Sequence, residues 1–200
     1  LAAQTAPPAM QARMKSLLDA VQRLSHFTHQ MLALARSSSE GAVAADHRPV
    51  DLDPLLGSVA ADFLVRADAA SIDLGCDTAP CPVYGSPWML REVAANLFEN
   101  ALHHAGPRAH VTGRCGVDDD GHPFMEVDDD GPGIPEAERD KVLDRFYRAR
   151  GTAGEGTGLG LAIVKEVADR HDARVEILGG RSGRGTCVRI VFPGAAAPRA

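Results

Sequence analysis

The chain has 200 residues, 44% of them hydrophobic and 24% charged, which is the composition of an ordinary soluble globular protein with one main core and a smaller extra element. Its formal net charge of −6, with the basic residues scattered along the sequence, argues against nucleic acid as a partner. The four cysteines form no CxxC pair, so neither a zinc cage nor a disulfide framework is expected, and a reducing cytoplasm fits best.

Targeting signals are missing from the sequence as given. No apolar run approaches the ~18 residues that cross a bilayer, and nothing resembles a signal peptide. Because the chain begins at Leu1, without an initiator Met and within an Ala-rich stretch, we expect a fragment of a longer protein. Any contact with a membrane would come from upstream segments, with this part on the cytoplasmic side of an inner-membrane sensor.

From Met14 to Ala35 the apolar positions alternate steps of three and four, as the seam of a coiled coil does. The pattern predicts a helix ~32 Å long, which starts after Pro7 and Pro8 and ends at a Ser- and Gly-rich hinge over 37–41. Its apolar stripe is too narrow for a helix alone in water. We therefore expect a helical hairpin or bundle, and a homodimer through this helix.

The rest of the chain alternates short helical and strand patterns, with Ser86 as a candidate N-cap and Pro87 as the first residue of a helix. Because the alternation is irregular, it predicts an α+β fold, a two-layer α/β sandwich with a mixed sheet, rather than a doubly wound parallel sheet. Helices are expected at 53–70, 87–104, 136–145 and 159–171, and strands at 71–76, 82–84, 109–115, 124–128, 174–178 and 186–192.

The run GEGTGLGLAIVK, from Gly154 to Lys165, is the most informative feature of the sequence. Alternating glycines let a ligand approach the backbone, and the following helix offers free N–H groups and a positive dipole end to an anion. The run predicts a phosphate site, although glycine-rich loops also serve as plain turns. Since there is no GxxxxGK[ST] motif, Mg²⁺, loop amides and basic residues would have to balance the phosphate charge.

The helix expected at 87–104 has two faces. Its apolar face consists of Leu90, Val93, Leu97 and Ala101, and its polar stripe of Glu92, Asn96, Asn100 and His103. Since Asn is a poor helix former, two asparagines one turn apart in mid-helix call for an explanation. One interpretation is a solvated helix face, and the other is a set of oxygen ligands for Mg²⁺ that carries a nucleotide.

Two further runs carry candidate ligand groups. In DDGPGI, over 129–134, a carboxylate at a strand end beside glycines can accept a hydrogen bond from an adenine amine, although these residues are also typical of an ordinary turn. In DRFYRAR, over 144–150, the arginines can meet a triphosphate while Phe146 anchors the segment to the core. The basic end of a surface helix has the same pattern.

Together and in this order, the runs resemble the ATP-binding catalytic domain of sensor histidine kinases, within the GHKL (Bergerat-fold) ATPase group. NLFENALHHA over 96–105 resembles the N box, DDGPGI over 129–134 the G1 box, RFYRAR over 145–150 the F box, and GTGLGLAIVK over 156–165 the G2 box. The resemblance implies an ATP-binding domain over 47–194, preceded over 1–41 by part of a dimerisation and phosphoacceptor hairpin. The tail over 195–200 is expected to be disordered.

For the site, the resemblance implies that Asn100 ligates Mg²⁺, that Asn96 assists at the phosphates and that Asp129 holds the adenine amine. The implied catalytic set is Asn96, His103 and Arg148. The implied nucleotide-binding residues are Asn96, Asn100, His103, His104, Asp129, Gly131, Gly133, Ile134, Phe146, Arg148, Gly156, Thr157, Gly158, Leu159, Gly160 and Leu161.

The implied reaction moves the γ-phosphate of Mg-ATP to a histidine of the dimerisation hairpin, from which it passes to the receiver domain of a response regulator, leaving ADP. Hydrolytic members of the group carry a Glu where this chain has Asn96, and an amide cannot act as a general base. Transfer is therefore favoured over hydrolysis. The family's acceptor box, His-Glu/Asp-x-x-x-Pro, is missing from the sequence, and we expect His26 and His29 to be helix-surface residues. The fragment is therefore not expected to autophosphorylate.

Two alternatives stay open: a GHKL-type ATPase switch of the chaperone or DNA-repair kind, and a degenerate nucleotide-sensing or dimerisation module. Asn96 and the heptad helix count against the first, and Asn100 with Asp129 counts against the second. The family's His-Gly-Gly after the last helix is replaced here by His-Asp-Ala over 171–173, which weakens the prediction of a glycine C-cap.

Overall fold

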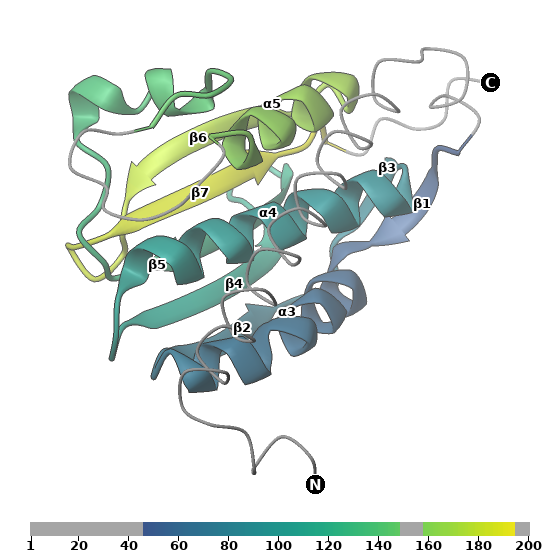
Figure 1. Ribbon diagram of the computed structural model, residues 1–200. Helices are drawn as coiled ribbons and strands as arrows, with labels where there is room; N and C mark the ends of the chain where they lie inside the picture. Colours follow the sequence, from purple (N-terminus) through teal and green to yellow (C-terminus); the bar gives the residue numbers. More distant parts are fainter. Residues whose placement is uncertain (1–45, 149–157, 195–200) are drawn as a thin grey trace, which may run out of the picture.

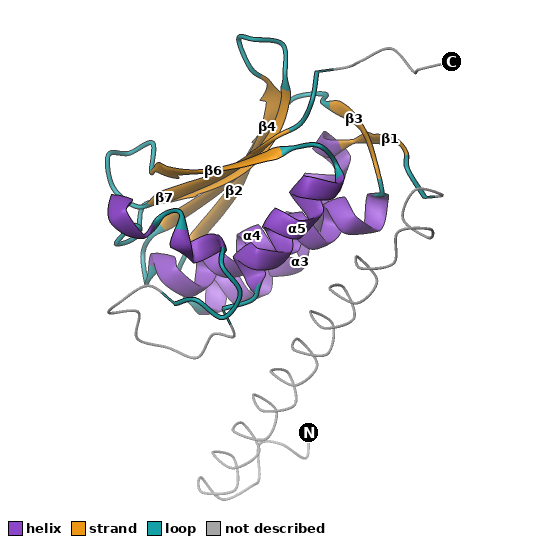
Figure 2. Ribbon diagram, turned by 90° about the horizontal axis from the view of Figure 1, so that it is seen from above, coloured by secondary structure: helices purple, strands orange, loops and turns teal. Residues whose placement is uncertain are grey.

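The computed structural model describes residues 46–148 and 158–194. The expected helical hairpin over 1–41, its hinge, and the tail over 195–200 lie outside the described residues. Within them the chain forms two layers, a five-stranded sheet and the helices α3, α4 and α5, which cover one face of that sheet (Figures 1 and 2). The predicted two-layer α+β sandwich is confirmed.

The large sheet has the strand order β2-β4-β5-β7-β6 and is mixed, since β2 and β4 run parallel while the other neighbours are antiparallel. Because side chains alternate along a strand, one face is apolar and packs on the helices, while the other carries charged groups such as Glu126 and Arg189. The strands are β2 (Asp73–Thr78), β4 (His110–Val117), β5 (Pro123–Asp129), β6 (Arg174–Gly179) and β7 (Thr186–Val191).

A second, two-stranded sheet pairs β1 (Arg48–Asp51) with β3 (Pro82–Gly85) in antiparallel register. Asp51 ends β1 and caps the next helix, because its carboxylate accepts hydrogen bonds from the backbone N–H groups of Asp53 and Cys81 at 3.2 and 3.0 Å. This small sheet therefore fixes the start of α3 and leads the chain into the main layer.

The helices are α3 (Leu52–Ala69), α4 (Pro87–Ala105) and α5 (Gly160–Arg170). The expected apolar face of α4 is buried, with Leu90 fully inaccessible and Ala101 only 3% exposed. Pro87 opens the helix as predicted, but the capping role of Ser86 is wrong in part. Ser86 occupies the N-cap position, yet its hydroxyl donates to Asp46 at 2.8 Å instead of accepting from the helix.

The short helix expected at 136–145 is wrong. The structure has two 3₁₀ turns instead, η2 (Glu136–Glu138) and η3 (Lys141–Leu143). Of these turn residues only Val142 is buried, so the segment has no apolar stripe that could offset the cost of nucleating an α-helix.

The end of α5 replaces the family's glycine with Asp172, which adopts the left-handed conformation with φ of 51°. The N–H of Ala173 donates back to the carbonyl of Ala168 at 2.9 Å, as in a Schellman cap. Asp tolerates this conformation better than most side chains do, so the cap forms without glycine, at an energetic cost.

Candidate nucleotide-binding site

Three consecutive aspartates at the end of β5 point in different directions because a strand alternates its faces. Asp128 lies on the outer face, where it accepts the backbone N–H of Arg181 at 2.9 Å. Asp130 is partly exposed and pairs with the imidazole Nδ1 of His110 at 2.9 Å. Only Asp129 turns towards the helical layer, and it is 5% exposed.

The carboxylate of Asp129 accepts the backbone N–H of Gly131 at 2.9 Å. Burial nevertheless raises the pKa of Asp129 from 3.8 to about 6, although hydrogen bonds from the Gly131 and Thr186 backbones oppose the rise. Among the described groups that shift this pKa there is no cation, so within the described residues the carboxylate keeps room to accept a further hydrogen bond.

The glycines after Asp129 bring the loop against the end of α4. A Cβ on Gly131 would lie 2.8 Å from the Cα of Ala105, and Gly133 has φ of +81° with its missing Cβ 2.8 Å from the carbonyl oxygen of Gly185. Both positions exclude side chains for steric reasons. The structure thus brings Asp129, Gly131 and Gly133 together, while Ile134 is half-buried in the same loop.

The sequence did not predict that the hairpin between β6 and β7 packs against the loop after Asp129. A Cβ on Gly185 would overlap the carbonyl oxygen of Asp129, and one on Gly180 would also approach that oxygen, at 2.7 Å. The four glycines within residues 179–185 carry the signal, because such a hairpin can lie directly against another backbone.

The polar stripe of α4 is not a uniform solvated face. Asn96 is 4% exposed, and its amide donates to the carbonyl of Glu92 at 2.8 Å. A Cβ on Gly160, the first residue of α5, would lie 3.3 Å from the Asn96 amide oxygen. Asn100, one turn later, is half-buried and His103 is exposed. The stripe therefore runs from the α4–α5 interface out to the open end of α4.

At that open end the rings of His103 and His104 meet edge to face with centroids 4.7 Å apart. Burial, then the charges of His103 and Arg148, lower the pKa of His104 from 6.5. Arg148 is thus within electrostatic reach of His104. The structure therefore places His103, His104 and Arg148, the residues expected near the phosphates, close to one another. An anionic group placed here would act against the lowering of the His104 pKa.

The expectation that Phe146 anchors its segment in the core is wrong, since Phe146 is 67% exposed. Tyr147 and Leu143 pack against the core instead. Phe146 has φ of 65°, and its N–H donates to the carbonyl of Gly158, itself at φ of 66°, at 2.9 Å. A backbone hydrogen bond between two left-handed residues therefore joins the two described segments of the chain at this point.

The remaining residues of the G2 run fall into two groups. Gly156 and Thr157 lie outside the described residues, as does Arg150 of the preceding run. Leu159 and Leu161 are 1% and 8% exposed and fasten the start of α5 to the core. These two leucines therefore shape the site by packing.

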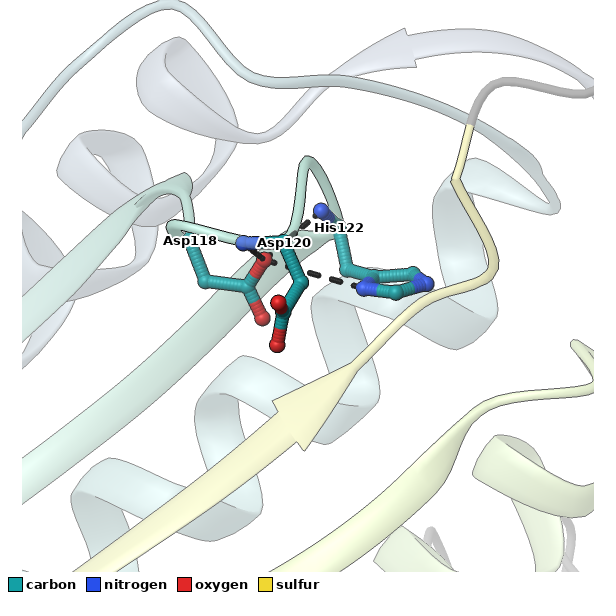
Figure 3. Close-up of side chains that lie close together, drawn as sticks. All are labelled: Asp118, Asp120 and His122. Atoms are coloured by element: carbon teal, nitrogen blue, oxygen red, sulfur yellow. Dashed lines mark hydrogen bonds and ion pairs between the residues drawn. The ribbon is translucent and has the colours of Figure 1, made fainter.

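Asp118, Asp120 and His122 form a separate cluster at the turn between β4 and β5 (Figure 3). The Asp118 carboxylate accepts the backbone N–H groups of Asp120 at 3.1 Å and His122 at 2.7 Å, and it lies 3.7 Å from the His122 Nδ1. These bonds are those of an Asx-type turn that closes the hairpin. They account for the arrangement without a ligand.

Comparisons with known proteins agree with this geometry. A family model described as "Histidine kinase-, DNA gyrase B-, and HSP90-like ATPase" matches residues 85–196, which defines the class of the domain as ATP-binding. The sensor protein kinase PmrB of Pseudomonas aeruginosa is 32% identical over 174 residues, and the sensor histidine kinase CusS of Escherichia coli O157:H7 is 32% identical over 183 residues. The chain belongs to the histidine kinase-, gyrase B- and HSP90-like ATPase family, and these relatives in it are sensor histidine kinases.

Solved structures give the same result. The mycobacterial sensor histidine kinase MprB matches with a TM-score of 0.67 at 31% identity, covering 74% of this chain and 98% of that one. Full-length ShkA in complex with AMPPNP matches with a TM-score of 0.74 at 25% identity, covering 96% of this chain and 41% of that one. The matches to PmrB and CusS cover 86% and 89% of this chain but only 36% and 37% of those proteins. In the part that the structure describes, no helix is both long and apolar enough to cross a membrane.

Proposed function

We propose that this chain is the catalytic region of a two-component sensor histidine kinase, which binds Mg-ATP and donates the γ-phosphate to a histidine outside the ATP-binding domain. The observation that carries the proposal is the buried carboxylate of Asp129, with its raised pKa, facing the helical layer beside the glycine loop. The adenine amine is a donor of the kind that this acceptor lacks. The phosphates would then extend towards His103, His104 and Arg148 at the end of α4.

The side chains around Asn100 fit a magnesium ion. Mg²⁺ usually takes one or two protein oxygens and completes its octahedron with water and phosphate oxygens. Asn100 offers an amide oxygen from a half-buried position between the buried Asn96 and the exposed His103. When bound, the ion would neutralise phosphate charge, while Asn100 would hold it and Asn96 would keep the start of α5 at its side.

Phosphoryl transfer is favoured over hydrolysis because no carboxylate occupies the position of Asn96. Its amide cannot take a proton from water, and its N–H₂ group is already bonded to the Glu92 carbonyl. A GHKL-type ATPase switch would need a base at that place. A degenerate nucleotide-sensing module is disfavoured because both Asp129 and the glycines that position its loop are intact.

The whole protein is proposed to be a sensor. The named relatives are nearly three times as long as the matched part, so the input segment and the rest of the dimerisation hairpin would lie elsewhere in the protein, with a membrane location through upstream segments. Homodimerisation through the helix expected at 14–35, and relay to a response regulator receiver domain, complete the proposal.

The test is calorimetric titration of the purified chain with a non-hydrolysable ATP analogue, with and without Mg²⁺, alongside phosphate release from ATP. We expect magnesium-dependent binding at about micromolar Kd, or ~−8 kcal/mol, without phosphate release. Rapid release would instead support the ATPase switch, and failure to bind at all would contradict the proposal.

Two variants test the assigned roles. Asp129→Ala should abolish the preference for ATP over GTP, because it removes the base-specific acceptor, whereas Asp130→Ala removes a neighbouring carboxylate that faces His110 and should keep the preference. Asn100→Ala should weaken binding only when Mg²⁺ is present. Equal losses with and without the ion would contradict the ligand role of Asn100.

A further inference from the structure

His171, at the end of α5, ties this helix to the start of α4. The side chain is 5% exposed, and both ring nitrogens are engaged. Nδ1 lies 2.7 Å from the carbonyl oxygen of Val167, which can only accept, so Nδ1 carries the proton. Nε2 then accepts the backbone N–H of Ser86 at 3.1 Å. The bond to Ser86 therefore requires a neutral imidazole.

Asp46 and His47, which precede β1, pack beside the hydrogen bond between His171 and Ser86. The His47 ring stacks on His171 with centroids 4.8 Å apart and planes at 20°, and the Asp46 carboxylate accepts the Ser86 hydroxyl at 2.8 Å. Gly85 leaves room for the ring, since a Cβ there would lie 2.5 Å from the His171 Cδ2. Residues distant in sequence thus meet at one joint between α4 and α5.

The joint sits at the opposite end of α5 from the nucleotide site. The start of α5, Gly160, lies beside Asn96 in the middle of α4, while its end, His171, lies beside Ser86 at the N-cap of α4. The two helices are therefore antiparallel neighbours held at two points (Figure 1). The 11 residues of α5 span ~16 Å, so a tilt of about 5° at the joint moves Gly160 by ~1.4 Å relative to Asn96.

We propose that His171 is a positioning residue of the nucleotide site, which sets the angle between α4 and α5 while neutral and releases it on protonation. Acid would convert Nε2 into a donor facing the Ser86 N–H, breaking the bond and leaving a buried donor unpaired. The effect on ligand binding rests on the proposed nucleotide function, because the start of α5, which would move, lies beside Asn96.

The charges around the joint set the direction of its titration. Among the described residues, Asp46 and His47 face it from the leading segment, Tyr84 from β3 and Asp172 from the end of α5. Burial, followed by the proximity of His47, lowers the pKa of His171 from 6.5, although the Val167 bond and Asp172 act against this. The neutral form therefore persists at physiological pH, and release requires a more acidic medium.

The joint can be observed without nucleotide, because the only tryptophan of the chain, Trp88, lies in the first turn of α4. We expect Trp88 fluorescence of the whole chain to show a transition with a midpoint below pH 6.5. His171→Gln should remove it, because the amide oxygen can accept from Ser86 but does not titrate. His122→Gln, in the β4–β5 turn, is the matched control and should keep it. An unchanged transition in His171→Gln would overturn the proposal.

A second variant keeps the test decisive if His171→Gln fails to fold. His47→Gln removes the stacked imidazole and its opposing charge, so the fluorescence midpoint should rise towards 6.5. An unchanged midpoint in this variant would overturn the role given to the joint.

The consequence for function is measured as the Kd of the non-hydrolysable ATP analogue at pH 7.5 and pH 5.5. Wild type should lose several-fold more affinity between these pH values than His171→Gln does. Asp129 and His104 are present in both proteins, so any effect of their own titration on the affinity cancels in this comparison. Equal losses would overturn the positioning role with nucleotide binding intact, whereas no binding by either protein at pH 7.5 would contradict the proposed function itself.

Discussion

Replacing Asp129 by Asn should stabilise the nucleotide-free domain at neutral pH, although the residue is assigned to ligand binding. The unfolded chain loses this proton near pH 3.8, while the folded chain keeps it up to about pH 6. Folding therefore takes up a proton between these values, and the associated stability is full below pH 3.8 and lost as the pH rises through 6. The difference between a pKa of 3.8 and one of about 6 corresponds to ~3 kcal/mol.

The substituted side chain in Asp129→Asn would be uncharged at every pH and could still accept the Gly131 N–H through its amide oxygen. The free energy of unfolding of this variant relative to wild type should therefore rise by up to ~3 kcal/mol between pH 3.5 and pH 7.5. Urea unfolding of both proteins, followed by circular dichroism at several pH values, measures this difference. Nucleotide must be left out, because its binding would stabilise wild type selectively.

Asp130→Asn is a control of opposite sign. The hydrogen bonds with His110 lower the pKa of Asp130, so its contribution to stability is present above pH 3.8 and is lost as the pH falls through its folded pKa. Its replacement should therefore destabilise the domain at neutral pH and have little effect in strong acid. A stability difference between wild type and Asp129→Asn that does not vary with pH would refute the reasoning.

Three further outcomes follow from the packing. Asp172→Gly should raise the free energy of unfolding by ~1 kcal/mol, measured in urea, because glycine adopts the φ of 51° without strain; an unchanged midpoint would contradict the cost assigned to this cap. Gly131→Ala should lower the melting temperature, at a cost of ~1–3 kcal/mol, because its Cβ would lie 2.8 Å from the Ala105 Cα; wild-type stability would show that the loop moves aside freely. Glu126→Ala should lower the free energy of unfolding, measured in urea, by ~3 kcal/mol or more. The fully buried carboxylate accepts from Arg189 at 2.6 Å, and its removal leaves that guanidinium uncompensated. A decrease below ~1 kcal/mol would mean that solvent replaces the pair.

The fold could be predicted to a large extent because its signals are local. The apolar spacing of α4, Pro87 at its first turn and the strand expected at 124–128 are set within single segments, and each appears where expected. The helix expected at 136–145 failed because it had charged residues and turn formers but no apolar stripe, so only contacts with the rest of the chain could decide its form. The anchoring role expected of Phe146 failed similarly, since an aromatic residue near a loop can point either way.

The sequence by itself determined the order of the three helices and of the strands from β2 onwards, the apolar face of α4 and the resemblance of four motifs to a kinase domain. These features depend on periodicity, turn residues and motif spacing, which are properties of neighbouring residues. Only the tertiary structure decided which of three adjacent aspartates turns towards the helical layer. It also placed the glycines of the β6–β7 hairpin against the loop after Asp129, and it brought His171 to Ser86, 85 positions away in the sequence. Burial, pKa and steric exclusion arise from groups that are distant along the chain, and a linear pattern does not encode which of them will meet.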